Sequence, residues 1–216
     1  MIDLSNIEEK LRLFLDITYD SCIALGHKYV ICGSMATYLQ GCKIVPNDID
    51  ILALSPKTVE LIADLMENYE IESSPSMDVD HWLSTPGQRI FTDVSEMGDE
   101  QWYMGRWIID NVKIEVAYIK SERSVSSSRK QNHIWENGPD MHPYLQTVEF
   151  SSYQIDVIPL EIQLNTNLLR GLDERVTEIL RVLRRGEVDS NLIKKAIHPS
   201  HLEFILTSLQ LNSVEK

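Results

Sequence analysis

The chain has few of the residues that disulfide-rich, collagen-like and disordered proteins need. Its 216 residues include only 3 cysteines, 9 glycines and 8 prolines. The three cysteines, at positions 22, 32 and 42, provide neither a disulfide framework nor the spacing of a metal knuckle, which fits a reducing compartment. Hydrophobic residues make up 43% and charged residues 25% of the chain, and this balance is typical of a soluble globular protein.

Positive charge is also scarce, with 20 Lys and Arg against 33 Asp and Glu and a formal net charge of −13. Non-specific nucleic-acid binding depends on Lys and Arg that neutralise phosphates, so this balance argues against a nucleic-acid partner. No apolar run reaches the roughly 18 residues of a membrane span and no signal peptide is recognisable, so we expect a cytoplasmic protein that does not contact membranes. The length favours one domain, with room for a small helical appendage.

Apolar periodicity predicts alternating helices and strands in the first third of the chain. A helix is expected over 5–25, with Ser5 and Glu8 as a capping box and Gly26 at its end. The further elements predicted here are a strand at 29–32, a short helix at 35–40, a strand at 48–52 and a helix that begins at Pro56 with Ser55 as its N-cap.

The pattern is weaker over 69–105, which reads as an irregular insertion. Two strand patterns then flank Asp110-Asn111, a pair typical of a two-residue type I′ turn, and predict a hairpin. The elements expected after it are a Ser-rich loop at 121–130, a strand at 153–158, a helix from Pro159 to a stop at Gly186, a helix from Ser190 to Ile197 and a last helix from Pro199 to Leu211.

The pattern with chemical content is Gly33-Ser34, followed after thirteen residues by Asp48-Ile49-Asp50. Residues two apart in a strand point to the same face, so the two aspartates should project together. Carboxylates this close repel one another unless a cation lies between them, which favours a hard divalent ion such as Mg²⁺. Gly33 allows close backbone approach, and a helix that begins at Ser34 would direct its N–H groups at an anion such as phosphate.

A third carboxylate is expected from the hairpin. In the strand 112–118, Lys113, Glu115 and Ala117 share one face, so Glu115 can join the two aspartates. The alternative interpretation of all three acids is a solvated strand face. Asp-x-Asp also occurs in sugar-nucleotide glycosyltransferases, but the roughly 30 residues before Gly33 are too few for the two βα units that such a site requires.

These residues resemble the nucleotidyltransferase superfamily related to DNA polymerase β. The sequence is also similar to a group of small prokaryotic nucleotidyltransferase-like proteins of undefined substrate, on the strength of its Trp135-Glu136 pair and of Ile158-Pro159-Leu160-Glu161. The resemblance implies an α/β (α+β) fold, with a mixed sheet flanked by helices and a C-terminal helical region. It implies a catalytic domain at 1–158, with the insertion at 69–105, and helices packed on it at 159–216.

The resemblance also implies a reaction, in which a nucleoside monophosphate moves from an NTP to a hydroxyl of a small molecule or a protein. Gly33 and Ser34 would hold the triphosphate, while Asp48, Asp50 and Glu115 would be catalytic and would bind two Mg²⁺ ions, or Mn²⁺ in their place. Two such ions stabilise the attacking and leaving oxygens of an in-line displacement.

The sequence departs from this family at one position. Relatives often carry a lysine on the helix after Pro159, where this chain has Asn167, so Arg170 is the nearby candidate for binding the nucleotide. A lysine and an arginine are not interchangeable as phosphate ligands. This leaves open a second function, an inactive nucleotide-binding or antitoxin-like module that works through a protein partner. Formation of a homodimer is also left open.

Other conspicuous residues have structural interpretations that we prefer. His198 and His201 are expected to be a surface pair at a helix start, and the basic residues around Arg181 to be a solvated helix face. Trp102 and Trp107 are expected in the core, although an aromatic ring there would also suit a nucleotide base.

Overall fold

The computed structural model describes residues 3–76 and 78–211. The first two residues of the predicted catalytic domain and the last five of the predicted helical region lie outside it. The strands are β1 (Tyr29–Cys32), β2 (Asp48–Ala53), β3 (Phe91–Val94), β4 (Glu100–Ile109), β5 (Val112–Ser121), β6 (Gln146–Phe150) and β7 (Tyr153–Val157).

The α-helices are α1 (Leu4–Leu25), α2 (Gly33–Leu39), α3 (Pro56–Leu65), α4 (Glu122–Lys130), α5 (Leu160–Leu169), α6 (Asp173–Leu183), α7 (Ser190–Ala196) and α8 (Pro199–Ser208). Two 3₁₀ helices, η1 (Glu67–Tyr69) and η2 (Pro139–Tyr144), complete the described elements. None of the described helices is both long and apolar enough to cross a membrane.

The seven strands form one mixed sheet in the order β3-β4-β5-β2-β1-β7-β6. Strand β2 lies antiparallel to β1 and parallel to β5, which places it at the centre of the sheet. Strand β7 pairs with β1 in parallel and with β6 antiparallel. The predicted mixed sheet flanked by helices is therefore confirmed.

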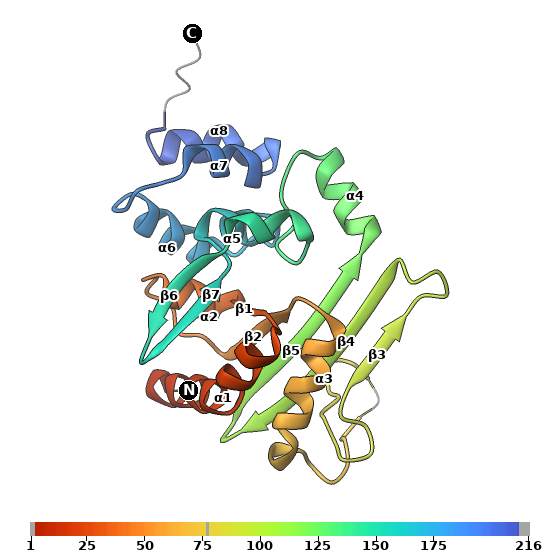
Figure 1. The fold of residues 1–216 in the computed structure, drawn as a ribbon. Coiled ribbons are helices and arrows are strands. Elements are labelled where there is room, and N and C mark those ends of the chain that lie inside the picture. Colours follow the sequence, from red (N-terminus) through yellow and green to blue (C-terminus); the bar gives the residue numbers. More distant parts are fainter. Residues whose placement is uncertain (1–2, 77, 212–216) are drawn as a thin grey trace.

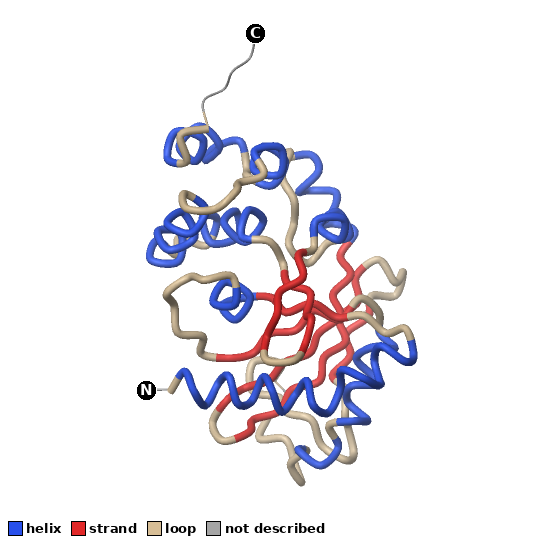
Figure 2. Tube along the Cα trace, turned by 60° about the vertical axis from the view of Figure 1, so that its left-hand side comes forward, coloured by secondary structure: helices blue, strands red, loops and turns tan. Residues whose placement is uncertain are grey.

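The two faces of the sheet carry different cores. On one face, Ile49 and Ile51 of β2 are buried with side chains of α1 and α3. On the other face, Leu52 packs with Ile162 of α5 and Leu192 of α7. Figures 1 and 2 show the C-terminal helices above the sheet and α1 below it. The central strand is thus buried on both faces, apart from the stretch where its aspartates lie.

Several predicted helix boundaries are confirmed and one cap is wrong. Gly26 ends α1 with a φ of 71°, and the Ser55 hydroxyl accepts a hydrogen bond from the Thr58 N–H at the start of α3. The N-cap of α1, however, is Asp3, whose carboxylate accepts from the Ser5 N–H. An aspartate two residues earlier caps as well as a serine does, so the helix begins at Leu4.

The predicted loop at 121–130 is instead helix α4. The hydroxyl of Ser121 accepts a hydrogen bond from the Ser124 N–H and caps the helix. Glu122 lies in the first turn and Arg129 and Lys130 in the last, an order of charges that favours the helix dipole. These terminal effects outweigh the modest helix propensity of serine.

Three other expectations need correction. The irregular insertion is shorter than 69–105, because β3 and the first half of β4 belong to the main sheet. The helix predicted from Pro159 to Gly186 is two helices, α5 and α6, separated at Gly171, which has a φ of 66°. Strand β6 was not predicted at all, because its sequence is mostly polar and its strand pairs only with β7.

The β4–β5 hairpin has the predicted type I′ turn. Asp110 and Asn111 both have positive φ, at 47° and 65°. This turn fixes the register of ten residue pairs, among them Arg106 opposite Glu115. The turn therefore decides which residue of β4 lies beside the predicted site.

A glycine suits the positive φ of Asn111 better than asparagine does. We expect Asn111→Gly to raise the free energy of unfolding by about 0.5 kcal/mol and Asn111→Val to lower it by about 1–2 kcal/mol, because a branched Cβ is strained there. Urea unfolding of the three proteins measures both effects. Equal stability of the glycine and valine variants would contradict the observed turn.

Candidate active site

The predicted acids lie side by side at the centre of the sheet. Asp50 is paired with Cys32 of β1 on one side and with Glu115 of β5 on the other. Asp48 is paired with Lys113. The neighbouring Ile49 and Ile51 point into the core under α1 and α3, so the carboxylates project from the opposite face, toward the C-terminal helices.

Gly33 meets this acidic face directly. It has a φ of +59°, and a Cβ at this position would lie 2.7 Å from Oδ2 of Asp50. No other residue type fits here without displacing the carboxylate. Ser34 follows in the first turn of α2 and is buried. Gly33 of the predicted Gly-Ser pair thus lies directly against the predicted metal ligand.

Two cations already neutralise part of the cluster. Nζ of Lys113 lies 3.1 Å from Oδ2 of Asp48 and 3.9 Å from Oε2 of Glu115. Arg106 binds Glu115 twice, from Nε at 2.7 Å and from Nη2 at 2.5 Å. A pair of contacts to one carboxylate fixes the guanidinium in place.

Arg106 is held in turn by the segment between η1 and β3. Its Nη1 donates to the carbonyl oxygens of Val79 and Trp82, at 2.5 and 3.3 Å, and its backbone N–H donates to the hydroxyl of Ser84 at 3.0 Å. Trp82 is completely buried against β4 and β5. The segment that the sequence left as an insertion therefore anchors a site residue.

The acids differ in their electrostatics. The pKa of Asp50 is raised from 3.8 to about 7, chiefly by burial and then by the negative charge of Asp48, while the charge of Lys113 opposes the shift. Burial alone lowers the pKa of Lys113, but the charges of Asp48 and Glu115 more than compensate and the pKa is raised. A divalent cation beside Asp50 would replace the proton that this carboxylate otherwise retains near neutral pH.

The donor set suits a metal ion at the two aspartates better than at all three acids. Among residues 3–76 and 78–211, no group of three His, Cys, Asp or Glu side chains is arranged to hold a metal ion. Mg²⁺ commonly takes one or two carboxylates and completes its shell with water and substrate phosphate. Asp48 and Asp50 fit that role, whereas Glu115 is engaged by Arg106.

A fourth acid, Glu136, lies in the segment before η2, and its charge reaches Cys32, the β1 residue paired with Asp50. Burial, and then the charges of Asp50, Glu136 and the other two acids, raise the pKa of the Cys32 thiol well above its usual value. Burial also raises the pKa of Glu136, while a hydrogen bond with Thr166 and then the charges of Arg170 and Arg175 oppose the shift. The charge of the predicted nucleotide ligand Arg170 thus acts on Glu136, and the charge of Arg175, from α6, lowers the pKa of both Glu136 and Asp50.

Asn167, at the family's lysine position, belongs to the helix interior. It is buried, and its Nδ2 donates to the carbonyl oxygen of Gln163 at 2.7 Å. The site lysine is Lys113, which comes from β5 and lies 3.1 Å from Oδ2 of Asp48. The acidic cluster therefore has a lysine, but it comes from β5 and not from α5, where the family pattern implies it.

Sequence reasoning missed Arg106, Glu136 as a member of the cluster, and Arg175. Arg106 could have been predicted from the sequence, because the predicted two-residue turn puts it opposite Glu115. The place of Arg175 follows from the packing of α6, which no local pattern reports. Arg181, in the basic group, contacts Glu178 and the carbonyl oxygen of Gly41, in keeping with a structural role.

Comparison with known proteins gives remote likenesses of structure. No protein-family model matches the sequence, and no curated protein matches it. A Thermotoga maritima protein classed provisionally as a nucleotidyltransferase superposes with a TM-score of 0.49 at 22% identity, over 82% of this chain and 94% of its own. The lincosamide antibiotic adenylyltransferase LnuA, with lincomycin bound, gives a TM-score of 0.39 at 10% identity, over 78% and 96%. At such distances, function has to be inferred from the site's own residues.

The Arg106–Glu115 pair should be important for stability, because its loss leaves a half-buried carboxylate and two carbonyl oxygens without their donor. We expect Arg106→Met to lower the free energy of unfolding by about 3 kcal/mol. Arg123→Met, at an exposed position on α4, is the matched control and should change it little. The double variant Arg106→Met/Glu115→Leu should recover part of the loss. If Arg106→Met and Arg123→Met lowered the free energy of urea unfolding equally, this role would be contradicted.

The raised pKa of Asp50 makes stability depend on pH. Between the ordinary value of 3.8 and about 7, the folded chain retains a proton that the unfolded chain has lost, so the free energy of unfolding falls as pH rises. Asp50→Asn removes this cost. We expect the stability of Asp50→Asn relative to wild type to increase by about 2 kcal/mol from pH 5 to pH 8. Asp93→Asn, at an exposed strand position, should show no such trend, and the same lack of trend in Asp50→Asn would refute the shifted pKa.

Proposed function

We propose that this chain is a Mg²⁺-dependent nucleotidyltransferase that moves a nucleoside monophosphate from an NTP to a hydroxyl of a small molecule or protein. The observation that carries the proposal is the contact between Gly33 and Asp50. It joins a backbone turn suited to phosphate with a half-buried carboxylate of raised pKa, beside a second carboxylate on the same face. This combination suits a metal-bound phosphate more than any neutral ligand.

Asp48 and Asp50 would hold the ion, which when bound would neutralise charge on the reacting phosphate. Gly33 and Ser34 would bind the triphosphate from its other side, through the backbone and the serine hydroxyl. Lys113 lies between Asp48 and Glu115. Its charge would act on the phosphates in place of the family's lysine, whose position Asn167 occupies in this chain. Arg170 and Arg175 would close the site from the C-terminal helices.

Glu115 as a third metal ligand and a two-ion site remain predictions. Arg106 would have to release Oε2 of Glu115 for that carboxylate to bind a second ion. With Arg106 in place, Glu115 would instead orient Arg106 and Lys113. Substitution of Glu115 separates these roles, because only a ligand changes metal affinity directly.

The second candidate is a nucleotide-binding or antitoxin-like module without turnover, which acts through a protein partner. The observation that favours it is the pairing of Lys113 with Asp48 and of Arg106 with Glu115, since two of the three predicted acids are neutralised within the chain. Such a module would bind an NTP but release no pyrophosphate, and it would form a stable complex with its partner.

Nucleotide binding tests the role of the aspartates. We expect calorimetry to give ATP or another NTP an affinity that rises with Mg²⁺ and falls at least about tenfold in Asp48→Asn and Asp50→Asn, since each removes a ligand of the metal. Asp93→Asn is the matched control, an exposed strand aspartate far along the sheet in β3. Unchanged affinity in both site variants would contradict the proposed metal binding. Glu115→Gln distinguishes a two-ion site, which predicts a similar loss, from an orienting role, which predicts a small one.

Turnover separates the two candidate functions. A screen of α-labelled NTPs with Mg²⁺ or Mn²⁺ and cell extract should transfer label to a small molecule or a protein and release pyrophosphate. The label should stay on the NTP in the Asp48→Asn protein. Tight NTP binding without any transfer, together with a stable complex in pull-downs, would favour the second candidate.

A further inference from the structure

A cavity of about 790 Å³ lies next to the acidic cluster, where β2 and β5 end. Its floor includes Leu52 and Ile119 of these strands, and its walls are α4 and the segment from Trp135 to η2. Small-molecule sites in proteins are commonly of this size. Half of the residues that line this one are apolar or aromatic, and the other half are polar or charged. The cavity contains none of the three predicted acids.

Leu52 of the cavity floor and the two aspartates share one face of β2. Leu52 lies two residues beyond Asp50 in β2, so it projects to the same side about 7 Å further along. Gly33 lies in the other direction, because β1 runs antiparallel to β2 and leaves the sheet toward the Asp48 end. Asp50 therefore stands between the proposed triphosphate side and the cavity.

This order matches the geometry of nucleotidyl transfer. In an in-line displacement the attacking oxygen approaches the phosphorus from the side opposite the leaving group. With pyrophosphate toward Gly33, the attacking hydroxyl must come from the Leu52 side. The cavity, which Leu52 lines, lies on that side.

The cavity wall has an aromatic surface. Trp135 precedes Glu136, the fourth acid of the cluster, and so connects the cavity to the site. A Cβ on Gly138 would lie 3.0 Å from the Trp135 ring and 3.6 Å from the side chain of Val125, so the indole lies close to α4. The indole can stack on an aromatic ring of a ligand.

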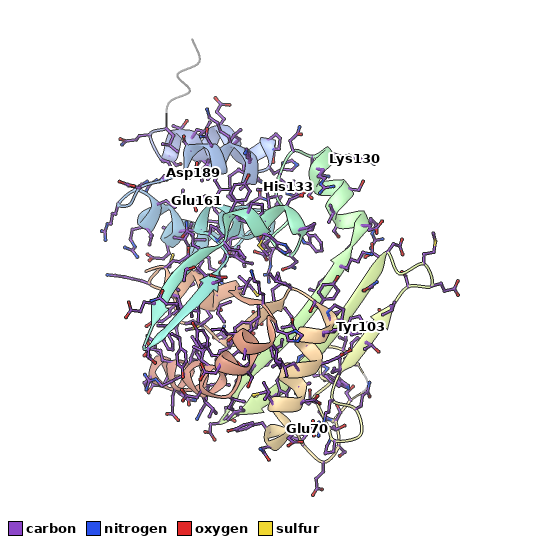
Figure 3. All side chains as sticks on the ribbon, in the orientation of Figure 1. Glu70, Tyr103, Lys130, His133, Glu161 and Asp189 are labelled. Atoms are coloured by element: carbon purple, nitrogen blue, oxygen red, sulfur yellow. The ribbon has the colours of Figure 1, made fainter. Side chains whose placement is uncertain are left out.

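The charges around the cavity are mostly positive, in a chain of net charge −13. Three cations and one carboxylate line it, namely Lys120, Arg129, Lys130 and Glu122. Lys120 lies 3.3 Å from Glu122, and Arg129 binds Asp140 outside the lining by two hydrogen bonds of 2.7 and 2.6 Å. Lys130, at the end of α4 (Figure 3), has no ion pair within the described residues. An anion would be attracted to this wall.

We propose that this cavity binds the acceptor, and that the acceptor is a small molecule with a hydroxyl on an aromatic ring and an anionic group directed at Lys130. The inference rests on the proposed nucleotidyl transfer for the role of the hydroxyl. The ring stacks on Trp135 over Leu52 and Ile119. The hydroxyl faces Asp50, and the anionic group lies at the opposite end of the cavity.

Three matched probes test this chemistry: 4-hydroxyphenylacetate, its neutral amide, and tyramine, which carry the same phenol with a different charge. Titrations followed by ligand-observed NMR should show the tightest binding for the anion and the weakest for the cation. Lys130→Gln should weaken only the anion, by about two- to fivefold, the usual value of one exposed ion pair. Lys194→Gln, an exposed lysine in the last turn of α7, is the control and should have no effect.

Two neighbouring serines of α4 provide a steric test. Ser126 lines the cavity and Ser127 does not, and both are exposed. Ser126→Trp should therefore abolish probe binding, whereas Ser127→Trp should leave it unchanged. Both variants should bind ATP with Mg²⁺ as the parent protein does, because neither touches the acidic cluster.

The outcomes separate this inference from the proposed function. Absence of binding by all three probes, equal affinities regardless of charge, or equal effects of the two tryptophan variants would overturn the inference while leaving ATP binding intact. Competition between ATP and the phenols would also overturn it, by assigning the cavity to the nucleotide base. Conversely, phenol binding as expected without any Asp48-dependent ATP binding would refute the proposed function and retain the anion-binding cavity.

Discussion

The site depends on how three carboxylates are held on one half-buried face of the sheet. Asp48, Asp50 and Glu115 project from adjacent strands, and the charge of a fourth acid, Glu136, reaches the neighbouring Cys32. Repulsion among such groups costs free energy in a low-dielectric setting unless cations or protons offset it. The chain uses Lys113 and Arg106 for two of the acids, and the pKa of Asp50 rises until it retains a proton near neutral pH. Asp50 is thus the position at which a bound cation would gain most.

This constraint gives the irregular segment between η1 and β3 a purpose. The carbonyl oxygens of Val79 and Trp82 hold Arg106, and Trp82 is buried against the sheet. A guanidinium fixed from both sides cannot easily leave Glu115. The neutralisation of the third acid is therefore a property of the fold and not of a mobile side chain. It is also the main reason why a two-aspartate metal site fits this chain better than a three-carboxylate one.

The C-terminal helices supply the side chains that lie opposite the sheet at the site. They pack through Ile162 and Leu192 onto the sheet beside Leu52, and they bring Arg170 and Arg175 toward the acids. Helix α4 and the Trp135 segment then enclose the cavity at the end of β2. In the proposed function, the triphosphate side and the cation-rimmed cavity meet at Asp50, an arrangement that would suit a small acceptor.

The sequence by itself determined the features set by short-range geometry. The shared face of Asp48 and Asp50 follows from the two-residue period of a strand, and the positive φ of Asp110 and Asn111 from the turn they form. Tertiary structure decided the rest, because parallel pairing of β2 with β5 joins residues more than sixty positions apart. Only that pairing put Lys113 on Asp48, and only the packing of distant segments fixed Arg106, Glu136 and the cavity. Local sequence specifies which groups are present on a face, whereas long-range packing decides which charges they meet.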